Sequence, residues 1–147
     1  MHYMYMDDHW ILVASRDEAR IFSISQDRTL NLVADIGNPT ARLKLQDLES
    51  DRPGRASDNR MRARYPLRSE ETSRERLLQN FYRDVFDLLE KKLLLHDFSR
   101  LTCIAEPRLL GILRSLYPSA LVRISPEEIP KDLSFESPPK IMKYLSR

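Results

Sequence analysis

Residues 10–37, WILVASRDEARIFSISQDRTLNLVADIG, decide the fold of this chain. The run from Trp10 to Ala14 is continuously apolar, which is typical of a strand buried on both faces. Short polar turns separate it from two further strand patterns, at residues 19–25 and 30–36. Strands joined by such short turns pair antiparallel. Alternation predicts one face for Phe22 and Ile24 in the second strand, and one drier face in the third strand for Leu30, Leu32, Ala34 and Ile36.

A long amphipathic helix is predicted further along the chain, from Ser69 to Leu95. Thr72-Ser73-Arg74-Glu75 fits a capping box, and Ser69 offers an alternative cap one turn earlier. Apolar residues recur at steps of three and four, which indicates one buried stripe. They are Leu77, Leu78, Phe81, Tyr82, Val85, Phe86, Leu88, Leu89 and Leu93.

The last third of the chain alternates strands and helices. We predict strands at residues 100–105 and 120–124, a helix at 107–116 after Glu106-Pro107, a proline-punctuated turn at 125–131 and a short helix from about 137 to 145. Strands separated by a helix lie parallel. The prediction is therefore one α/β domain over residues 1–147. It has a ribonuclease-H-like mixed sheet of five strands in the order 3-2-1-4-5, three antiparallel and then two parallel, with one long and two short helices.

Composition narrows the functional classes. The chain has 147 residues and a formal net charge of only +2, which argues against a general nucleic-acid binder and leaves room only for a local basic patch. No apolar run is long enough to span a bilayer. The first ten residues lack the basic-then-apolar pattern of a signal peptide, so we expect a cytoplasmic protein. The single cysteine, Cys103, cannot form a disulfide framework, and the three histidines show no ligand spacing with it, so we expect no metal and no cofactor.

The third strand and the long helix are joined by a long polar loop, residues 38–68. Loops of this length inside a compact domain are functional or disordered. Its second half carries about +5 on 17 residues, with only Asp58 opposing six arginines. Arginine pairs with phosphates in bidentate fashion and stacks on bases, and Tyr65 adds an aromatic ring. The candidate RNA- or anion-binding residues of this loop are Arg52, Arg55, Arg60, Arg62, Arg64, Tyr65 and Arg68. A solvated loop whose arginines pair with nearby acids is the alternative.

Three other patterns were weighed. Asp51, Pro53 and Gly54 are typical of a structural turn, which we favour over a catalytic role for Asp51. Arg108 follows a strand end and could help to hold an anion at a helix start, although Pro107 removes one backbone donor and no glycine-rich turn precedes it. Carboxylates for a metal-dependent nuclease are available at Asp35, Glu106 and Glu71 or Glu75, but no convergent set emerges, so we assign no catalytic residue.

Several stretches along the chain form a recognisable combination. They are Trp10 to Ala14, Ala19-Arg20-Ile21-Phe22, Asn38-Pro39 with Ala41-Arg42, Asp47-Leu48, Ser50-Asp51-Arg52-Pro53-Gly54-Arg55, Glu106-Pro107-Arg108-Leu109-Leu110-Gly111 and Lys131-Asp132-Leu133. Together they resemble the bacterial host attachment protein family. The resemblance covers the chain from about residue 10 to the end, and it implies a role in attachment to host cells. Family members often carry a glycine-rich stretch and an Arg-His pair after Ser-Asp-Arg-Pro-Gly-Arg, and a histidine where this chain has Phe135.

The family's fold is in turn similar to the middle domain of archaeal and eukaryotic peptide-chain release factors. In those proteins a loop before a long helix carries a Gly-Gly-Gln tip that reaches the ribosomal peptidyl-transferase centre. The loop of this chain has no Gly-Gly-Gln, and Gly54 is its only glycine. The resemblance therefore implies contact with the ribosome or RNA, and it does not imply peptidyl-tRNA hydrolysis.

Three functional hypotheses follow. The first is a non-catalytic cytoplasmic binding domain whose arginine-rich loop contacts RNA or the ribosome. The second is a protein-interaction or self-associating module with an indirect role in host-cell attachment, which would use the exposed side of the long helix and the apolar lead-in of Tyr3, Met4, Tyr5 and Met6. The third and least favoured is a hydrolase.

Overall fold

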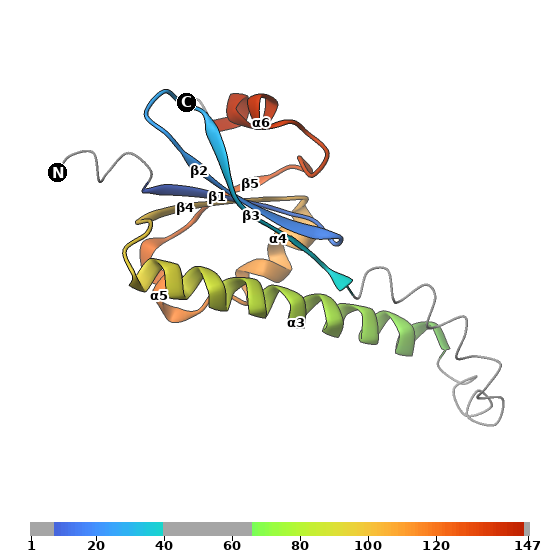
Figure 1. The fold of residues 1–147 in the computed structure, drawn as a ribbon. Helices are drawn as coiled ribbons and strands as arrows, with labels where there is room; N and C mark the ends of the chain where they lie inside the picture. Colours follow the sequence, from blue (N-terminus) through green and yellow to red (C-terminus); the bar gives the residue numbers. More distant parts are fainter. Residues whose placement is uncertain (1–7, 40–65, 146–147) are drawn as a thin grey trace.

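The computed structural model describes residues 8–39 and 66–145, with side chains of the long helix from residue 73 onward. Strands β1 (His9–Ala14), β2 (Glu18–Ile24) and β3 (Leu30–Gly37) come first, followed by helix α3 (Pro66–Leu94). Strand β4 (Arg100–Ala105) leads through helices α4 (Pro107–Arg114) and α5 (Ser119–Ile124) to strand β5 (Glu127–Pro130), and helix α6 (Pro138–Leu145) closes the described part. Figure 1 shows these elements.

The five strands form one mixed sheet in the order β3-β2-β1-β4-β5. β2 pairs antiparallel with both β1 and β3, whereas β1 pairs parallel with β4 and β4 pairs parallel with β5. The predicted α/β class and strand order are confirmed. Helix α3 begins at Pro66, three residues before the predicted start, because proline is well suited to the first helical position.

The identity of the fifth strand was predicted wrongly. Residues 120–124 lie in helix α5, and the strand is Glu127–Pro130, inside the stretch interpreted as a turn. The apolar run misled because only Leu121 is buried, against the α3 side of the sheet, while Val122 faces solvent. The prolines misled because β5 is an edge strand, where a missing N–H group is tolerated. The described chain therefore has three short helices, where two were predicted.

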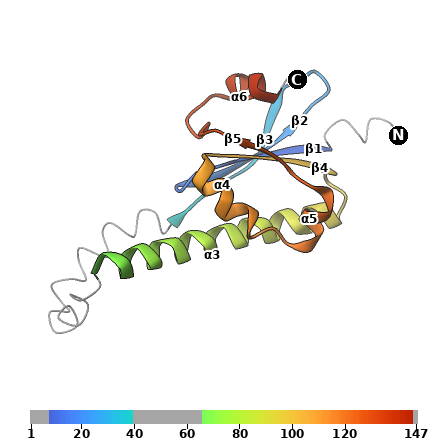
Figure 2. The same cartoon turned by 180° about the vertical axis from the view of Figure 1, so that it is seen from behind.

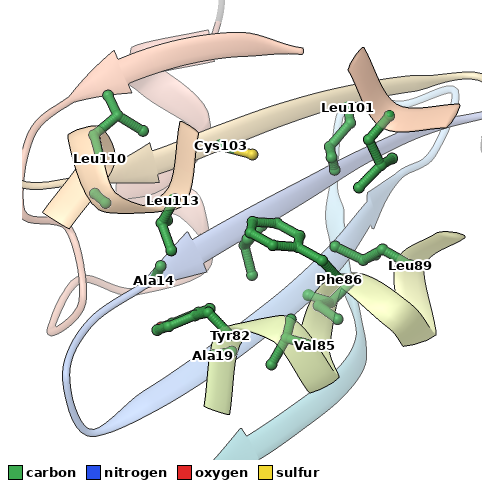
Figure 3. Close-up of a cluster of buried hydrophobic side chains, with 14 of the residues drawn as sticks. Ala14, Ala19, Tyr82, Val85, Phe86, Leu89, Leu101, Cys103, Leu110 and Leu113 are labelled. Atoms are coloured by element: carbon green, nitrogen blue, oxygen red, sulfur yellow. The ribbon is translucent and has the colours of Figure 1, made fainter. Parts of the chain in front are cut away.

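The sheet is covered on both faces, as the apolar β1 requires. Helices α3, α4 and α5 lie on one face and α6 on the other, which Figures 1 and 2 show from opposite sides. In the larger core, α3 contributes Tyr82, Val85, Phe86 and Leu89, which point at the sheet and at α4 (Figure 3). The smaller core under α6 gathers residues from the opposite faces of the same strands, including Ile11, Val13 and Phe22. Leu77, predicted in the helix's apolar stripe, is exposed.

A bulge in β3 overturns the prediction of a single drier face for that strand. Ala34 is the partner of Ile21 and Leu32 is the partner of Phe22, so Val33 is the extra residue. Ala34 and Ile36 consequently pack toward the α3 side, whereas Leu30 joins the core under α6 and Leu32 faces solvent.

None of the helices in the described part of the chain combines the length and apolar character needed to cross a lipid bilayer.

Candidate functional site at the carboxyl edge of the sheet

Four of the five strands run in the same direction, so their last residues lie along one edge of the sheet. These residues are Ala14, Gly37, Ala105 and Pro130, and we call this the carboxyl edge. In open α/β sheets ligands bind at this edge. The β1–β2 turn, the chain leaving β3, the start of α4 and the loop after β5 all lie there, at the right of Figure 1 and the left of Figure 2.

Asn38 fixes the point at which the chain leaves the sheet toward residues 52–68, which we call the arginine-rich segment. Its side chain is buried, and its Nδ2 donates to the Arg16 carbonyl at 2.9 Å. Its backbone N–H donates to the Asp17 carbonyl at 2.7 Å. The departing chain is therefore tied to the β1–β2 turn.

Tyr82 ties helix α3 to the same turn. Its hydroxyl donates to the Ser15 carbonyl at 2.6 Å and accepts from the Ser15 backbone N–H at 3.0 Å. The ring is fully buried, and burial raises the pKa of the phenol well above its usual range. One turn thus holds both the strand that enters the segment and the helix that follows it.

Helix α3 projects beyond the sheet at this edge. Ser73 to Leu77 are all exposed, and Leu78 is the first buried side chain described on the helix. At 1.5 Å per residue, the stretch from Pro66 to Leu77 extends roughly 18 Å. Figures 1 and 2 both show the start of α3 lying clear of the sheet. The first turns of α3 therefore extend past the sheet, and residues 52–65 lead directly into them.

Most of the predicted binding residues belong to the segment itself. Arg52, Arg55, Arg60, Arg62, Arg64 and Tyr65 lie outside the described residues, as do the turn residues Asp51, Pro53 and Gly54. Arg68 lies in the first turn of α3, and its side chain is also outside the described part. The sheet topology places the remaining candidate, Arg108, at the carboxyl edge that anchors the segment.

The start of α4 is capped from within the chain. The Glu106 carboxylate accepts hydrogen bonds from the backbone N–H groups of Arg108 and Leu109, both at 3.0 Å. An anion at this helix end would therefore have to displace Glu106. The guanidinium groups of Arg108 and Arg16 are exposed and form no ion pair with any residue that the structure describes.

A pair of carboxylates meets near the same edge. Burial raises the pKa of Glu18, and a hydrogen bond shared with Asp35 raises it further. The Arg20 guanidinium lies 3.8 Å from Glu18 and opposes this rise. Asp35 is thus engaged with Glu18, and Glu106 caps α4, so these two candidates for a nuclease site do not converge. Within residues 8–39 and 66–145, no group of three or more metal-ligating side chains is placed to hold an ion.

Sequence reasoning missed a polar line on the α6 side of the sheet. His9 Nε2 lies 2.8 Å from Thr102 Oγ1, and the Thr102 hydroxyl donates to Glu127 at 2.9 Å. Burial and the nearby Arg100 lower the pKa of His9. These three residues join the neighbouring strands β1, β4 and β5. Because Thr102 is fully buried, its hydroxyl is not an accessible nucleophile.

A second missed polar line lies on the opposite face. Arg114 donates to the Glu128 carboxylate through Nε and Nη2, the latter at 2.6 Å, and Tyr117 donates to the same carboxylate at 3.0 Å. The hydrogen bond from Arg114 lowers the pKa of Glu128. Burial raises the pKa of the neighbouring Cys103 thiol to about 12, so this thiol is inert at neutral pH. Thr102 pairs with Glu127 and Cys103 with Glu128 between β4 and β5. The adjacent acids Glu127 and Glu128 were the sequence feature from which both polar lines could have been predicted.

One family model matches residues 10–145, and its description is "Protein required for attachment to host cells". The chain belongs to this host attachment family. The match runs from β1 to the last residue of α6, so it includes both anchors of the arginine-rich segment and the capped start of α4. Comparison with curated proteins gave no match.

In this host attachment family protein, Tyr82→Phe should lower the free energy of unfolding by about 0.5–1.5 kcal/mol, because the Ser15 carbonyl loses its hydroxyl donor and the Ser15 N–H loses one of its two acceptors. Urea unfolding monitored by circular dichroism measures the change. Tyr144→Phe is the matched control, since Tyr144 is partly exposed and the change removes only its hydroxyl. Equal midpoints for the two variants would show that the hydroxyl does not hold the turn.

The Arg114–Glu128 pair should make stability depend on pH in an acidic window. The folded-state pKa of Glu128 lies below its ordinary 4.5, so its contribution is present above that pH and is lost as pH falls through the lowered value. Because Arg114 is largely exposed, solvent screens the ion pair and its contribution to stability is small. Urea unfolding of the wild type and Glu128→Gln across a pH series should show a gap at neutral pH that closes in acid. In a protein that carries Arg114→Met, adding Glu128→Gln should change stability much less at neutral pH. A difference between wild type and Glu128→Gln that does not vary with pH would show that the ion pair is not its cause.

Proposed function

We propose that this host attachment family protein is a non-catalytic, cytoplasmic binding domain whose arginine-rich segment, residues 52–68, contacts RNA or the ribosome. The observation that carries the proposal is the attachment of this segment at the carboxyl edge, between Asn38 and the projecting helix α3.

Charge separation along the chain supports the proposal. The whole chain is +2 while the segment is about +5, so the remaining residues are net negative. A polyanion is therefore attracted to the segment and repelled by the rest of the protein. Such an arrangement gives a binding orientation as well as an affinity.

The architecture gives the second support. Helix α3 projects beyond the sheet, and a projecting helix can reach into a groove of a large ribonucleoprotein. The similarity to the middle domain of peptide-chain release factors rests on the order of the elements, in which a long loop precedes a long helix. It is an analogy of architecture, and the absence of Gly-Gly-Gln limits the proposal to contact without hydrolysis. The connection to host attachment is then indirect, through RNA or translation inside the cell.

The proposal predicts that the protein co-sediments with ribosomes or total RNA in a salt-dependent manner. Replacing Arg60, Arg62 and Arg64 together by alanine should weaken binding and flatten the slope of log affinity against log salt by up to about 2, since each phosphate contact on a single strand contributes about 0.7.

The control variant replaces Arg83, Lys91 and Arg123 by alanine. These residues are exposed, lie outside the segment and carry the same total charge. Equal losses for the two triple variants would indicate general charge attraction, and an unchanged profile for the segment variant would remove the proposal's basis.

Self-association is the second candidate function, and one surface favours it. Leu94 and Leu95, at the end of α3, are 64% and 66% exposed, and Val122 on the adjoining α5 is 55% exposed. Apolar side chains gathered on adjoining helices are typical of interaction surfaces. If this surface pairs, light scattering should give an oligomer that Leu95→Asp with Val122→Asp converts to a monomer. A wild-type protein that is monomeric at all concentrations would exclude it.

A further inference from the structure

Three exposed apolar side chains lie at the end of the sheet opposite the carboxyl edge. They are Leu94 and Leu95 at the end of α3, which are 64% and 66% exposed, and Val122 on the adjoining α5, which is 55% exposed. We call these three residues the leucine patch. Helix α3 ends just before β4 begins, and α5 ends just before β5 begins. Figures 1 and 2 show the end of α3 beside α5, far from the projecting start of the helix.

The end of α3 is fixed in a way that leaves its leucines uncovered. His96 has a left-handed backbone with a φ of 65°, its N–H donates to the Leu93 carbonyl, and the Asp97 N–H donates to the Lys92 carbonyl, both at 2.9 Å. These are the two hydrogen bonds of a Schellman motif, which is commonly completed by an apolar contact between the outermost pair of residues. Here that pair is Asp97 and Lys92, whose charged groups lie 3.9 Å apart. The helix end therefore supplies no apolar cover of its own.

The chain enters the sheet beside the leucine patch. The Asp8 carbonyl accepts hydrogen bonds from the backbone N–H groups of Ser99 at 2.8 Å and Arg100 at 3.0 Å. The Ser99 hydroxyl donates to the Asp8 carboxylate at 2.9 Å. Asp8 is thus held by the short connection that joins the end of α3 to β4.

The residues just before Asp8 are apolar. Residues 3–6, the apolar lead-in, read Tyr-Met-Tyr-Met and lie outside the described part of the chain. An extended chain covers at most about 3.6 Å per residue, so Tyr5 has its Cα within about 11 Å of Asp8. Methionine adapts to irregular apolar surfaces, and tyrosine can bury its ring while its hydroxyl stays in water. The lead-in therefore has the chemistry and the reach to cover the patch.

A second pair of exposed apolar side chains is less accessible from Asp8. Leu32 and Val33 on β3 are 58% and 43% exposed. Strand β2 separates β3 from β1, whereas the hydrogen bonds of Asp8 go to the opposite side, toward β4. The attachment of Asp8 thus favours the leucine patch over the edge strand.

We infer that the apolar lead-in folds back on the leucine patch of its own chain and covers it. Attachment through Asp8 gives the lead-in an effective concentration of about millimolar at the patch, so a small apolar contact is sufficient to hold it. The contact lies at the end of the sheet away from the arginine-rich segment, so it does not depend on what that segment binds. It also competes with the pairing of two chains through the same patch.

The first measurement is the rate at which a maleimide labels Leu94→Cys in the full chain. The rate is compared between a chain with its lead-in intact and one in which residues 3–6 are all replaced by serine. Loss of the cover should raise the labelling rate by about 5- to 30-fold, as expected for one modest apolar contact. Cys103 is buried and does not compete for the reagent.

Leu32→Cys is the matched control, because Leu32 is exposed to a similar extent on the far side of β2. Its labelling rate should be the same with either lead-in. An unchanged rate at Leu94→Cys would overturn the inference. An equal rise at both positions would overturn it as well, since the lead-in would then cover no particular surface.

The second measurement identifies the chain that supplies the cover. Tyr5→Cys combined with Leu95→Cys is oxidised mildly and analysed by non-reducing electrophoresis and mass spectrometry. The expected product is a monomer with an internal disulfide, formed at a rate independent of protein concentration, because the two thiols are tethered. A disulfide-linked dimer would overturn the inference and would show that the lead-in of one chain covers the patch of another, in support of self-association.

Light scattering tests the competition with pairing. The chain with serine at residues 3–6 should associate at lower concentration than the wild type, and adding Leu95→Asp with Val122→Asp should remove that difference. Equal association of the wild type and the serine chain would show that the lead-in does not compete for the patch.

Discussion

Burial of β1 on both faces is the constraint on which the rest of the structure depends. Ile11, Leu12 and Val13 are almost wholly inaccessible and alternate between the two cores. A strand apolar on both sides needs a layer on each face of the sheet. The parallel pairing with β4 then requires a helical crossover, and the crossover helices supply the larger layer. The carboxyl ends of four strands are left at one edge, where long connections can leave the sheet without disturbing either core.

The fold was predictable from sequence wherever local pattern and tertiary environment agree. The first three strands and β4 carry apolar runs bounded by turns, and these placed the strand order correctly. Residues 120–130 were not predictable in this way. Pro126 precedes β5 and Pro130 is its last residue, which an edge strand tolerates, and Leu121 is the one buried residue of the helix at 119–124. The error hid Glu127 and Glu128, and with them both polar lines. The bulge at Val33 leaves no trace in the alternation of β3 and is set by pairing with β2.

The candidate site divides in the same way. The charge of residues 52–68 can be counted from sequence, and the place of Arg108 after β4 follows from the strand pattern. The contacts that position the site cannot, since they join residues far apart in the chain. Tyr82 binds a turn 67 residues earlier, and Arg20 binds carbonyls more than 110 residues later. Periodicity identified Tyr82 as a core residue and gave no indication that its hydroxyl organises the edge.

Arg20 shows what these long-range contacts specify. Its Nε is buried without a hydrogen bond, and the nearest carboxylate oxygen, on Glu18, is 3.8 Å away. Burial and the neighbouring Asp35 raise the pKa of Glu18, so they disfavour the charged form of this partner. Moving a guanidinium out of water is costly, and neutral carbonyls compensate this cost only in part, so a partly buried cation of this kind is weak evidence for stability. An apolar residue at this position would pack under α6 at lower cost, but it could not hold at one point the three backbone carbonyls of the β5–α6 loop that Arg20 Nη2 contacts. The arginine therefore determines the conformation of the loop between β5 and α6, and its position on β2 sets that loop at the edge where the cationic segment is anchored.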